Sequence, residues 1–403
     1  MAIDPAPGPS LSRAMQGTAP RLLIPTLSAV NFLVGMGAFL TIGLIEPIAD
    51  DFGVTDAQSG ALLTSYAVIY AVLSPLLVSL TGTMGRRRVL ALGLAILGIS
   101  ALLSALAPSL LVLHISRGLA AMGAGLVTPV SAAVATMLTP PERRARTIAA
   151  VFAGLTIAQA VGIPVGGWVA YTFGWRYAFA ILAALSLPAL VLLWRIVPAG
   201  LSFTPVSLRD LGRIVGDLPT MGAILFTATF LCSIFLLYTY FAPLLAADMG
   251  FGRDGITLTL FIFGLGAIVG NVTGGTFSDR IGASRTLTIL TALQIVTLPL
   301  YSFLPLPAPL LLAYTFAWSV IGWSFGAAQQ VRLVTLDPAR APVLLSLNAA
   351  CIYLGAAAGS SIGGLVISRA SVSALGIAAA LVMVAALAHL ILSDRATVRR
   401  ARP

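Results

Sequence analysis

The sequence predicts an all-α membrane protein whose twelve transmembrane helices form two pseudo-symmetric six-helix bundles. Three observations lead to this fold class. Of the 403 residues, 59% are hydrophobic and only 9% are charged, whereas soluble domains carry about 25% charged residues. Apolar runs of about 20 residues, the length of a helix that spans a bilayer, recur along the chain. Finally, a pattern of spaced glycines in the first half returns in the second half.

The net charge of +10 does not indicate a nucleic-acid-binding protein. Every basic residue is an arginine, and the arginines separate apolar runs instead of forming one cluster. The sequence has no G-x-x-x-x-G-K-[ST] loop for a nucleotide, no metal-ligand cluster and no activated nucleophile, so we expect neither an enzyme nor a metal site nor a cofactor. Cys232 and Cys351 both lie within apolar runs, which predicts two buried thiols without a disulfide framework.

The chain divides into two bundles between short polar ends. Residues 1–20, rich in Pro, Gly, Ala and Ser, predict a disordered cytoplasmic tail. In the N-terminal bundle (residues 21–196) we expect spans near 22–46, 57–81, 88–107, 109–137, 147–171 and 177–196. In the C-terminal bundle (residues 219–393) we expect spans near 219–247, 256–277, 285–304, 309–331, 343–368 and 372–392. Residues 197–218 favour an amphipathic cytoplasmic linker, and residues 394–403 a second cytoplasmic tail.

The distribution of arginines predicts the orientation. With the N-terminus placed inside, only Arg176, Arg253 and Arg369 fall on the outer side, and Arg117 lies within a span. An excess of positive residues in short cytoplasmic loops sets the topology of membrane proteins. We therefore expect a monomeric multi-pass protein of the bacterial inner (plasma) membrane, surrounded by the lipid bilayer, with both termini in the cytoplasm.

The fifth predicted span contains the sequence Gly162-Ile-Pro-Val-Gly-Gly-Trp168, and its glycines return 197 positions later in the eleventh span. Small residues let transmembrane helices approach closely, and neighbouring helices satisfy the backbone groups that a proline frees. An offset shared by several segments indicates a duplicated half-protein. We expect close packing between the two halves at Gly162, Pro164, Gly166, Gly167, Gly355, Gly359 and Gly363.

The loop after the second span of each half resembles a signature of the major facilitator superfamily, Gly-x-x-x-Asp-Arg-x-Gly-Arg-Arg. The second-half copy is Gly275-Thr-Phe-Ser-Asp279-Arg280-Ile-Gly282-Ala-Ser-Arg285, whereas the first-half copy has Gly82 in place of the acid. Three further segments resemble the sugar- and arabinose-efflux branch of the drug:proton antiporter family: Arg117 with Gly125 and Pro129, the Gly162 motif followed by Gly174-Trp-Arg176, and Ser346-Leu-Asn348 with Leu354-Gly355. The resemblance covers the chain after residue 20 and implies alternating access.

The second-half loop predicts a latch that closes the cytoplasmic side. The carboxylate of Asp279 can lie against the N-terminus of the fifth span, where unpaired amides carry a partial positive charge. Gly82 offers no charge at the equivalent place, so the latch is expected to be asymmetric. The alternative is a positive loop with one incidental ion pair. The latch residues are Asp279, Arg280, Gly282, Arg285, Gly85, Arg86 and Arg87.

Arg117 is the one arginine inside an apolar run, and an intramembrane cation is a candidate functional residue by default. The resemblance implies a role in proton coupling; the alternative is a side chain that snorkels to the surface. His114, one turn earlier, can share the site. Glu46 and Asp248 at the outer mouth are candidate proton carriers, and Glu46 either pairs with Arg117 or is an ordinary interfacial acid. If neither acid titrates in the cavity, the protein is weakly coupled or a facilitator.

The resemblance implies a substrate site near the midplane, between the halves. Polar and aromatic residues at that depth describe a neutral, hydrogen-bonding cavity, although each can instead hold helices together. The candidates are Asn31, Tyr66, Tyr70, Gln159, Tyr238, Tyr240, Trp318, Trp323, Asn348 and Tyr353. We expect export of a small sugar-like or drug-like molecule in exchange for protons. The alternative is an uptake symporter, or an uncoupled facilitator, for a small neutral solute.

Overall fold

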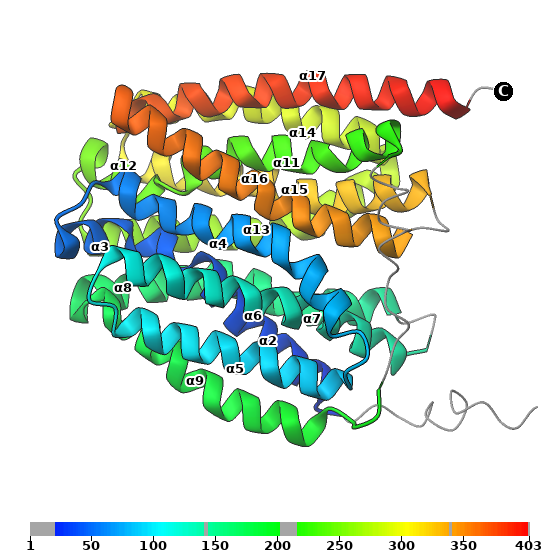
Figure 1. Ribbon diagram of the computed structural model, residues 1–403. Helices are drawn as coiled ribbons and strands as arrows, with labels where there is room; N and C mark the ends of the chain where they lie inside the picture. Colours follow the sequence, from blue (N-terminus) through cyan, green and yellow to red (C-terminus); the bar gives the residue numbers. More distant parts are fainter. Residues whose placement is uncertain (1–20, 141–143, 202–215, 338–340, 402–403) are drawn as a thin grey trace, which may run out of the picture.

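The computed structural model describes residues 21–140, 144–201, 216–337 and 341–401, and every regular element in these ranges is helical (Figure 1). The N-terminal bundle consists of α2 (Leu23–Phe39), the 3₁₀ turn η1 (Leu40–Leu44), α3 (Ile45–Phe52), α4 (Asp56–Leu80), α5 (Arg86–Ala105), α6 (Leu110–Met137), α7 (Arg144–Ile157), the π-helical turn η3 (Ala158–Gly162), α8 (Ile163–Phe173) and α9 (Trp175–Ile196). The C-terminal bundle consists of α11 (Leu218–Tyr238), α12 (Phe241–Met249), α13 (Arg253–Ile281), α14 (Ala283–Thr297), η4 (Leu298–Ser302), α15 (Ala308–Leu336), α16 (Ala341–Arg369), η6 (Val372–Ala374) and α17 (Leu375–Ala401).

The prediction of twelve spans is confirmed within the described ranges, where 12 helical segments are long and apolar enough to cross a membrane. The main differences lie at the boundaries. The eighth span covers Arg253–Ile281 and not only 256–277, because the helix continues beyond its apolar part. The residues between 202 and 215, where the linker helix is expected, lie outside the described residues. Cys232 and Cys351 are free and buried, as predicted.

Prolines explain three interruptions of the spanning helices. Pro47 is the third residue of α3 and Pro243 the third residue of α12, and each helix follows a break in its span. A proline has no N–H to donate and its ring clashes with the carbonyl four residues earlier, which disfavours a regular α-helix in the preceding turn. Pro164 has the same effect in the fifth span, where the π-helical turn η3 precedes α8.

The helices pack in the same way within each bundle. In the N-terminal bundle α4 packs on α6, α2 packs on α7 and η3, and η1 packs on α8; in the C-terminal bundle α13 packs on α15, and α11 on α16. The bundles meet along two contacts related by the same symmetry: α4 lies against α16, and α13 lies against η3 and α8 (Figure 1). The fifth span therefore lies at the seam between the bundles and not in the lipid.

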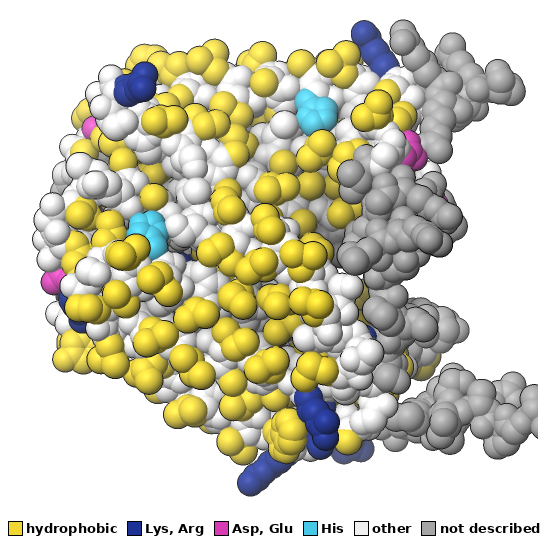
Figure 2. All heavy atoms as spheres, in the orientation of Figure 1, with side chains coloured by type: hydrophobic (Ala, Val, Ile, Leu, Met, Phe, Trp, Pro, Cys, Tyr) yellow, Lys and Arg dark blue, Asp and Glu magenta, His cyan; other side chains and the backbone are white. Residues whose placement is uncertain are grey.

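Hydrophobic side chains cover the middle of the molecular surface, while the charged side chains visible in Figure 2 lie toward its periphery. Large apolar side chains such as Leu80, Val272 and Val296 are exposed to 78%, 69% and 76%. Such a surface would be unstable in water and matches a hydrocarbon environment. We call the end that carries Arg86–Arg88, Arg195, Arg280 and Arg285 the arginine-rich end, and the other the opposite end.

Candidate functional site

Arg117 is buried inside the N-terminal bundle and does not snorkel to the surface. Its side chain is 1% exposed, although it comes from the second turn of α6. Nη2 donates a hydrogen bond of 3.0 Å to the carbonyl oxygen of Ala38, and the guanidinium carbon lies 4.9 Å from the centre of the Tyr66 ring. Ala38 is in the last turn of α2, where carbonyls lack helical donors and the helix dipole favours a cation. The sequence alternative of a snorkelling arginine is therefore excluded.

No described carboxylate forms an ion pair with Arg117. Its Nε atom is also buried without a hydrogen-bond partner among the described residues. A charge held by one carbonyl, a helix end and an aromatic face is only partly compensated in a low-dielectric interior. The site therefore favours the arrival of a negative group close to Arg117.

The candidate acids lie elsewhere. Glu46, in the first turn of α3, accepts a hydrogen bond of 2.6 Å from the hydroxyl of Tyr171 and does not pair with Arg117. The ion pair between Glu46 and Arg117 that the sequence allowed is therefore absent. Arg117 donates to the Ala38 carbonyl, and α3 directs the Glu46 carboxylate toward Tyr171 of α8. Asp248, half-buried near the end of α12, forms no ion pair with a described residue. His114 contacts Ser65 on α4 through Nδ1 at 2.7 Å.

Three of the predicted cavity tyrosines meet at the seam between the bundles. Tyr353 on α16 lies with its ring centre 3.7 Å from that of Tyr70 and 5.9 Å from that of Tyr66, both on α4. Phe39, at the end of α2, stacks on the same Tyr353 ring at 6.3 Å and on Phe235 of α11 at 5.8 Å. These aromatic rings form a layer that crosses the seam next to Arg117, since Tyr66 belongs to both groups. We call Phe39, Tyr66, Tyr70, Phe235 and Tyr353 the aromatic layer.

Three other predicted cavity residues, Tyr238, Trp318 and Asn348, hold helices together within the C-terminal bundle. The Tyr238 ring stacks on Phe263 at 4.2 Å, and Trp318 lies 4.9 Å from Phe263. Thr227 donates a hydrogen bond of 2.5 Å to Asn348, which joins α11 to α16.

Four candidates remain. Asn31 donates to the carbonyl of Leu27 in its own helix, and its Oδ1 atom is buried without a described partner. Tyr240 donates to the carbonyl of Ser360 at 2.9 Å. Gln159 is 8% exposed within η3, and Trp323 is half-buried beside Gly270.

The glycines predicted to pack between the bundles instead pack inside each bundle. A Cβ atom added to Gly162 or Gly166 would overlap Met36 or Leu40 of the first span, in the same bundle. The second-half counterparts repeat this arrangement: added Cβ atoms at Gly355, Gly359 and Gly363 would meet α11 and, for Gly363, Tyr240. Gly167 likewise faces Gly43, and the neighbouring Pro164 produces the π-helical turn. The sequence identified the helices that pack closely but gave the wrong face of each. The same glycine spacing permits close packing against a helix of the same bundle or of the other bundle.

Other small residues bring the two bundles together. An added Cβ at Gly264 of α13 would overlap the backbone of Ala160 in η3, and one at Gly60 of α4 would overlap the Tyr240 ring. Gly364 faces Ala57 across the same seam. The closest backbone contact between the bundles is thus made where the Pro164 interruption lies, at the middle of the fifth span.

The opposite end of the molecule is closed by contacts between the bundles. Thr64 and Ser361 share a hydrogen bond of 3.2 Å, and Ser360 donates to the carbonyl of Gly60 at 2.9 Å. Arg253 donates to the hydroxyl of Thr172 at 3.1 Å. In addition, α12 packs against α3 and η1. All three of these hydrogen bonds join the two bundles toward this end.

The latch residues lie at the arginine-rich end. Asp279 and Arg280 are exposed at the end of α13, Arg285 is exposed on α14, and none of them forms an ion pair within the described residues. Gly282 adopts a positive φ of 87° between the two helices. Arg143 is outside the described residues, as are the side chains of Arg144 and Arg146.

In the first-half loop, the arginines bond to their own bundle. Arg86 is buried and its backbone N–H, next to Gly85, donates to the carbonyl of Leu201 at 3.0 Å. The guanidinium of Arg87 stacks 4.5 Å from the centre of the Trp194 ring.

A twelve-span fold with a seam between two related bundles agrees with the sequence comparison. Residues 27–338 match the profile of the Major Facilitator Superfamily. The chain belongs to the major facilitator superfamily. It is therefore a multi-pass membrane protein that carries a small solute across the membrane.

The most informative relatives are two proteins of Bacillus subtilis (strain 168). The uncharacterized MFS-type transporter YbcL is 30% identical over 367 residues, which cover 91% of this chain and 94% of YbcL. The uncharacterized MFS-type transporter YtbD is 28% identical over 361 residues, which cover 88% of this chain and 90% of YtbD.

The fold resembles a bacterial homologue of the human lysosomal transporter Spinster in its inward-facing, unoccupied conformation. The TM-score is 0.74 at 18% identity, over 97% of this chain and 99% of that one. The occupied, inward-facing form of that homologue gives a TM-score of 0.72 at 16% identity, over 96% and 98%. At this identity the similarity concerns the fold alone.

Sequence reasoning missed the residues that close the seam. Phe39 and Phe235 lie in continuous apolar runs, where an aromatic residue carries no signal that separates a seam position from an ordinary core position. Thr64 and Ser361 are single small polar residues in spans, which are usual in membrane helices. Their partners lie 297 residues away in the sequence, so only the assembled fold joins them.

Proposed function

We propose that the protein exports a small neutral or amphipathic molecule, sugar-like or drug-like, from the cytoplasm in exchange for protons. The observation that carries this proposal is the environment of Arg117, a buried cation without a described carboxylate partner, whose ring contact Tyr66 belongs to the aromatic layer. Keeping a charge there is costly, and it serves no packing purpose that an apolar residue would not serve better. A role in energy coupling explains why it is present.

In this proposal the described state has its central pathway closed toward the periplasm and the arginine-rich end lies in the cytoplasm. The excess of arginine at that end supports the orientation. The cross-bundle hydrogen bonds of Thr64 and Arg253 support closure of the opposite end. Rocking about the contact between Gly264 and Ala160 would separate the aromatic layer and open the pathway to the periplasm.

Glu46 is the proposed proton carrier. It is half-buried at the periplasmic end and its carboxylate is held by the Tyr171 hydroxyl in the closed state. Opening of that end would expose the carboxylate to the acidic side of the membrane. A protonated Glu46 and an ionised Glu46 interact differently with the buried Arg117 charge, and this difference is what links protonation to conformation.

Asp279 is the proposed latch of the alternative state. Asp279 forms no ion pair with a described residue, as expected of a latch residue while the cytoplasmic end is open. Closing that end would bring the carboxylate to the N-terminus of the fifth span. The latch is thus expected to form only when the periplasmic contacts separate.

The proposal is tested by flux in proteoliposomes of the full-length protein. A ligand is first identified by its stabilisation of the purified protein in a thermal-shift screen. Its flux is then measured with an imposed pH gradient in each direction and with no gradient. Exchange for protons predicts that flux accelerates when ligand and protons move in opposite directions. Acceleration in the same direction would indicate an uptake symporter, and independence of the gradient would indicate a facilitator.

A further inference from the structure

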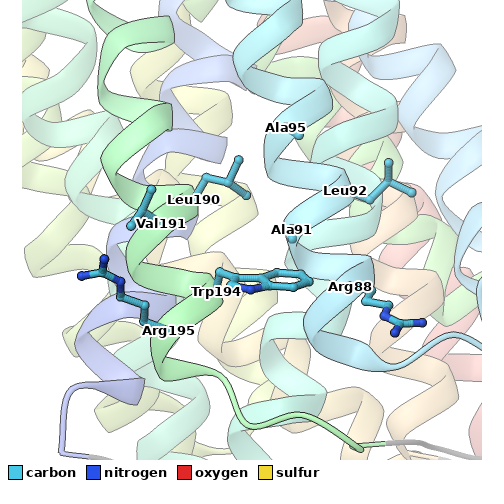
Figure 3. A pocket seen from close by; sticks show the side chains of 8 residues that line it. All are labelled: Arg88, Ala91, Leu92, Ala95, Leu190, Val191, Trp194 and Arg195. Atoms are coloured by element: carbon cyan, nitrogen blue, oxygen red, sulfur yellow. The ribbon is translucent and has the colours of Figure 1, made fainter.

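A groove on the outer surface of the N-terminal bundle lies between α5 and α9, near the arginine-rich end (Figure 3). It has a volume of about 530 Å³. Both helices contribute apolar side chains, including Leu92, Leu190 and Val191, and each contributes one arginine, Arg88 or Arg195. The short side chains of Ala91 and Ala95 leave the space on α5 that makes the groove.

The apolar part of the groove faces the surroundings of the protein. Leu92 is 42% exposed, Val191 52% and Trp194 45%. Figure 3 shows the Trp194 indole extending from α9 across the groove toward α5. Arg87 holds the indole in this orientation: its guanidinium stacks on the Trp194 ring, and the Nη1 atom of Arg87 lies 3.5 Å from the Trp194 carbonyl oxygen. A rigid aromatic surface next to a shallow apolar trough fits an acyl chain better than it fits water.

The polar part of the groove is entirely cationic. Arg88 and Arg195 lie on the two sides of Trp194 (Figure 3), and both are exposed. The lining contains no acidic residue, and neither arginine forms an ion pair with a described carboxylate. Guanidinium groups bind phosphate through charge-assisted, bidentate hydrogen bonds. Basic sites between transmembrane helices at the membrane surface favour anionic lipid headgroups.

We propose that this groove binds one anionic phospholipid of the leaflet at the arginine-rich end. Its phosphate lies at the mouth of the groove, where the exposed Arg88 and Arg195 side chains, which point away from each other in Figure 3, can turn toward it from either side of Trp194, and an acyl chain follows the groove against Trp194 and Leu190. The C-terminal bundle provides an internal comparison, because Arg285 is the repeat counterpart of Arg88 and is likewise exposed at the arginine-rich end. This site is separate from the seam and does not depend on the proposed transport reaction.

The test uses full-length protein in phosphatidylcholine vesicles that contain increasing amounts of dibrominated phosphatidylglycerol. Bromine quenches nearby tryptophan fluorescence. The difference in quenching between the unaltered protein and Trp194→Phe measures the lipid bound in the groove. Each arginine near an anionic surface contributes about fivefold to lipid affinity. We expect phosphatidylglycerol to be preferred over phosphatidylcholine roughly 25-fold at Trp194, the product of the two arginine contributions. In Arg88→Gln/Arg195→Gln the two lipids should bind there nearly equally.

The control is Arg280→Gln/Arg285→Gln, which removes the same charge at the same end of the molecule and should keep the preference. Quenching by brominated phosphatidylcholine, measured in parallel, shows that each variant is folded in the bilayer. An unchanged preference in Arg88→Gln/Arg195→Gln overturns the proposal. So does an equal loss in the control, which would mean diffuse attraction. Absence of any quenching at Trp194 also overturns it, because the groove would then be covered by the chain itself.

Discussion

The two bundles share their backbone architecture and differ in chemistry at equivalent places. The first and seventh spans, which are interrupted near Pro47 and Pro243, each end at a glycine in the left-handed conformation, Gly53 with φ 62° and Gly250 with φ 63°. Tyr314 and Phe263 stand 197 positions after Arg117 and Tyr66. The N-terminal bundle therefore has a guanidinium on an aromatic face, where the C-terminal bundle has only aromatic residues.

The aromatic residues of the C-terminal bundle form one continuous cluster. Phe263 stacks on Tyr238 at 4.2 Å, and Trp318 contacts both Phe263 and Tyr301, at 4.9 and 5.0 Å. Such a cluster is rigid and uncharged, whereas the Arg117 site is charged and incompletely compensated. Duplication therefore preserved the packing but not the chemistry: the N-terminal bundle carries a buried charge, to which we assign the proposed coupling role, and the C-terminal bundle carries a buried aromatic cluster.

The largest expected effect comes from removing that charge. Arg117→Gln should abolish the response of flux to a pH gradient, a loss in the range of about 5- to 150-fold that typifies coupling between sites. Tyr314→Phe changes the equivalent position of the other bundle and should retain the response. Proteoliposome flux with and without the gradient measures both. Equal responses in the two variants would show that the bundles do not divide the roles in this way.

The second effect concerns the seam. Gly264→Ala places a methyl group against the Ala160 backbone, and overpacking of this kind costs about 1–3 kcal/mol. We expect flux to fall roughly tenfold, with a lower midpoint of thermal unfolding. Gly275→Ala on the same helix is the matched control, because its added Cβ would make only an ordinary contact with Ala327 at 3.9 Å. If both variants behave alike, the contact between Gly264 and Ala160 is not the pivot.

The smallest effect is expected at Asp279. A carboxylate at a helix N-terminus contributes about 0.3–1 kcal/mol when exposed and up to ~2 kcal/mol when partly buried. Asp279→Asn should therefore favour the inward-open state by a few-fold. Distances between spin labels at Thr55→Cys and Arg369→Cys, measured by double electron–electron resonance, report the population of the inward-open state. The two positions flank the seam at the opposite end. Unchanged distance distributions would show that Asp279 is not a latch.

Most of the fold follows from the sequence, because span length, arginine distribution and the repeated glycines are local signals. The twelve spans and the seam position of residues 147–171 rest on such signals. The glycine faces could not be predicted in the same way. Gly162 is flanked by two neighbouring helices, and only the assembled bundle shows that Met36 fills the space beside it.

The candidate site was predictable in part. An arginine in an apolar run is rare, so Arg117 was evident from the sequence, whereas its partner is a backbone carbonyl, that of Ala38, which leaves no trace in the sequence. Glu46 and Arg117 suggest a pair by charge alone, yet the rotation of α3 after its break turns the carboxylate to Tyr171. Long-range partners that depend on helix rotation require the structure.

The central claim is that the contacts at the opposite end must separate in every transport cycle. Thr64→Cys and Ser361→Cys, introduced together in a background with Cys232→Ala and Cys351→Ala, replace a hydrogen-bonded pair whose oxygen atoms are 3.2 Å apart. The decisive measurement is proteoliposome flux after oxidation and again after reduction. The account predicts that the disulfide stops flux and that reduction restores it, while each single-cysteine variant is unaffected. If fully cross-linked protein transports as fast as the same protein after its disulfide has been reduced, the account is contradicted.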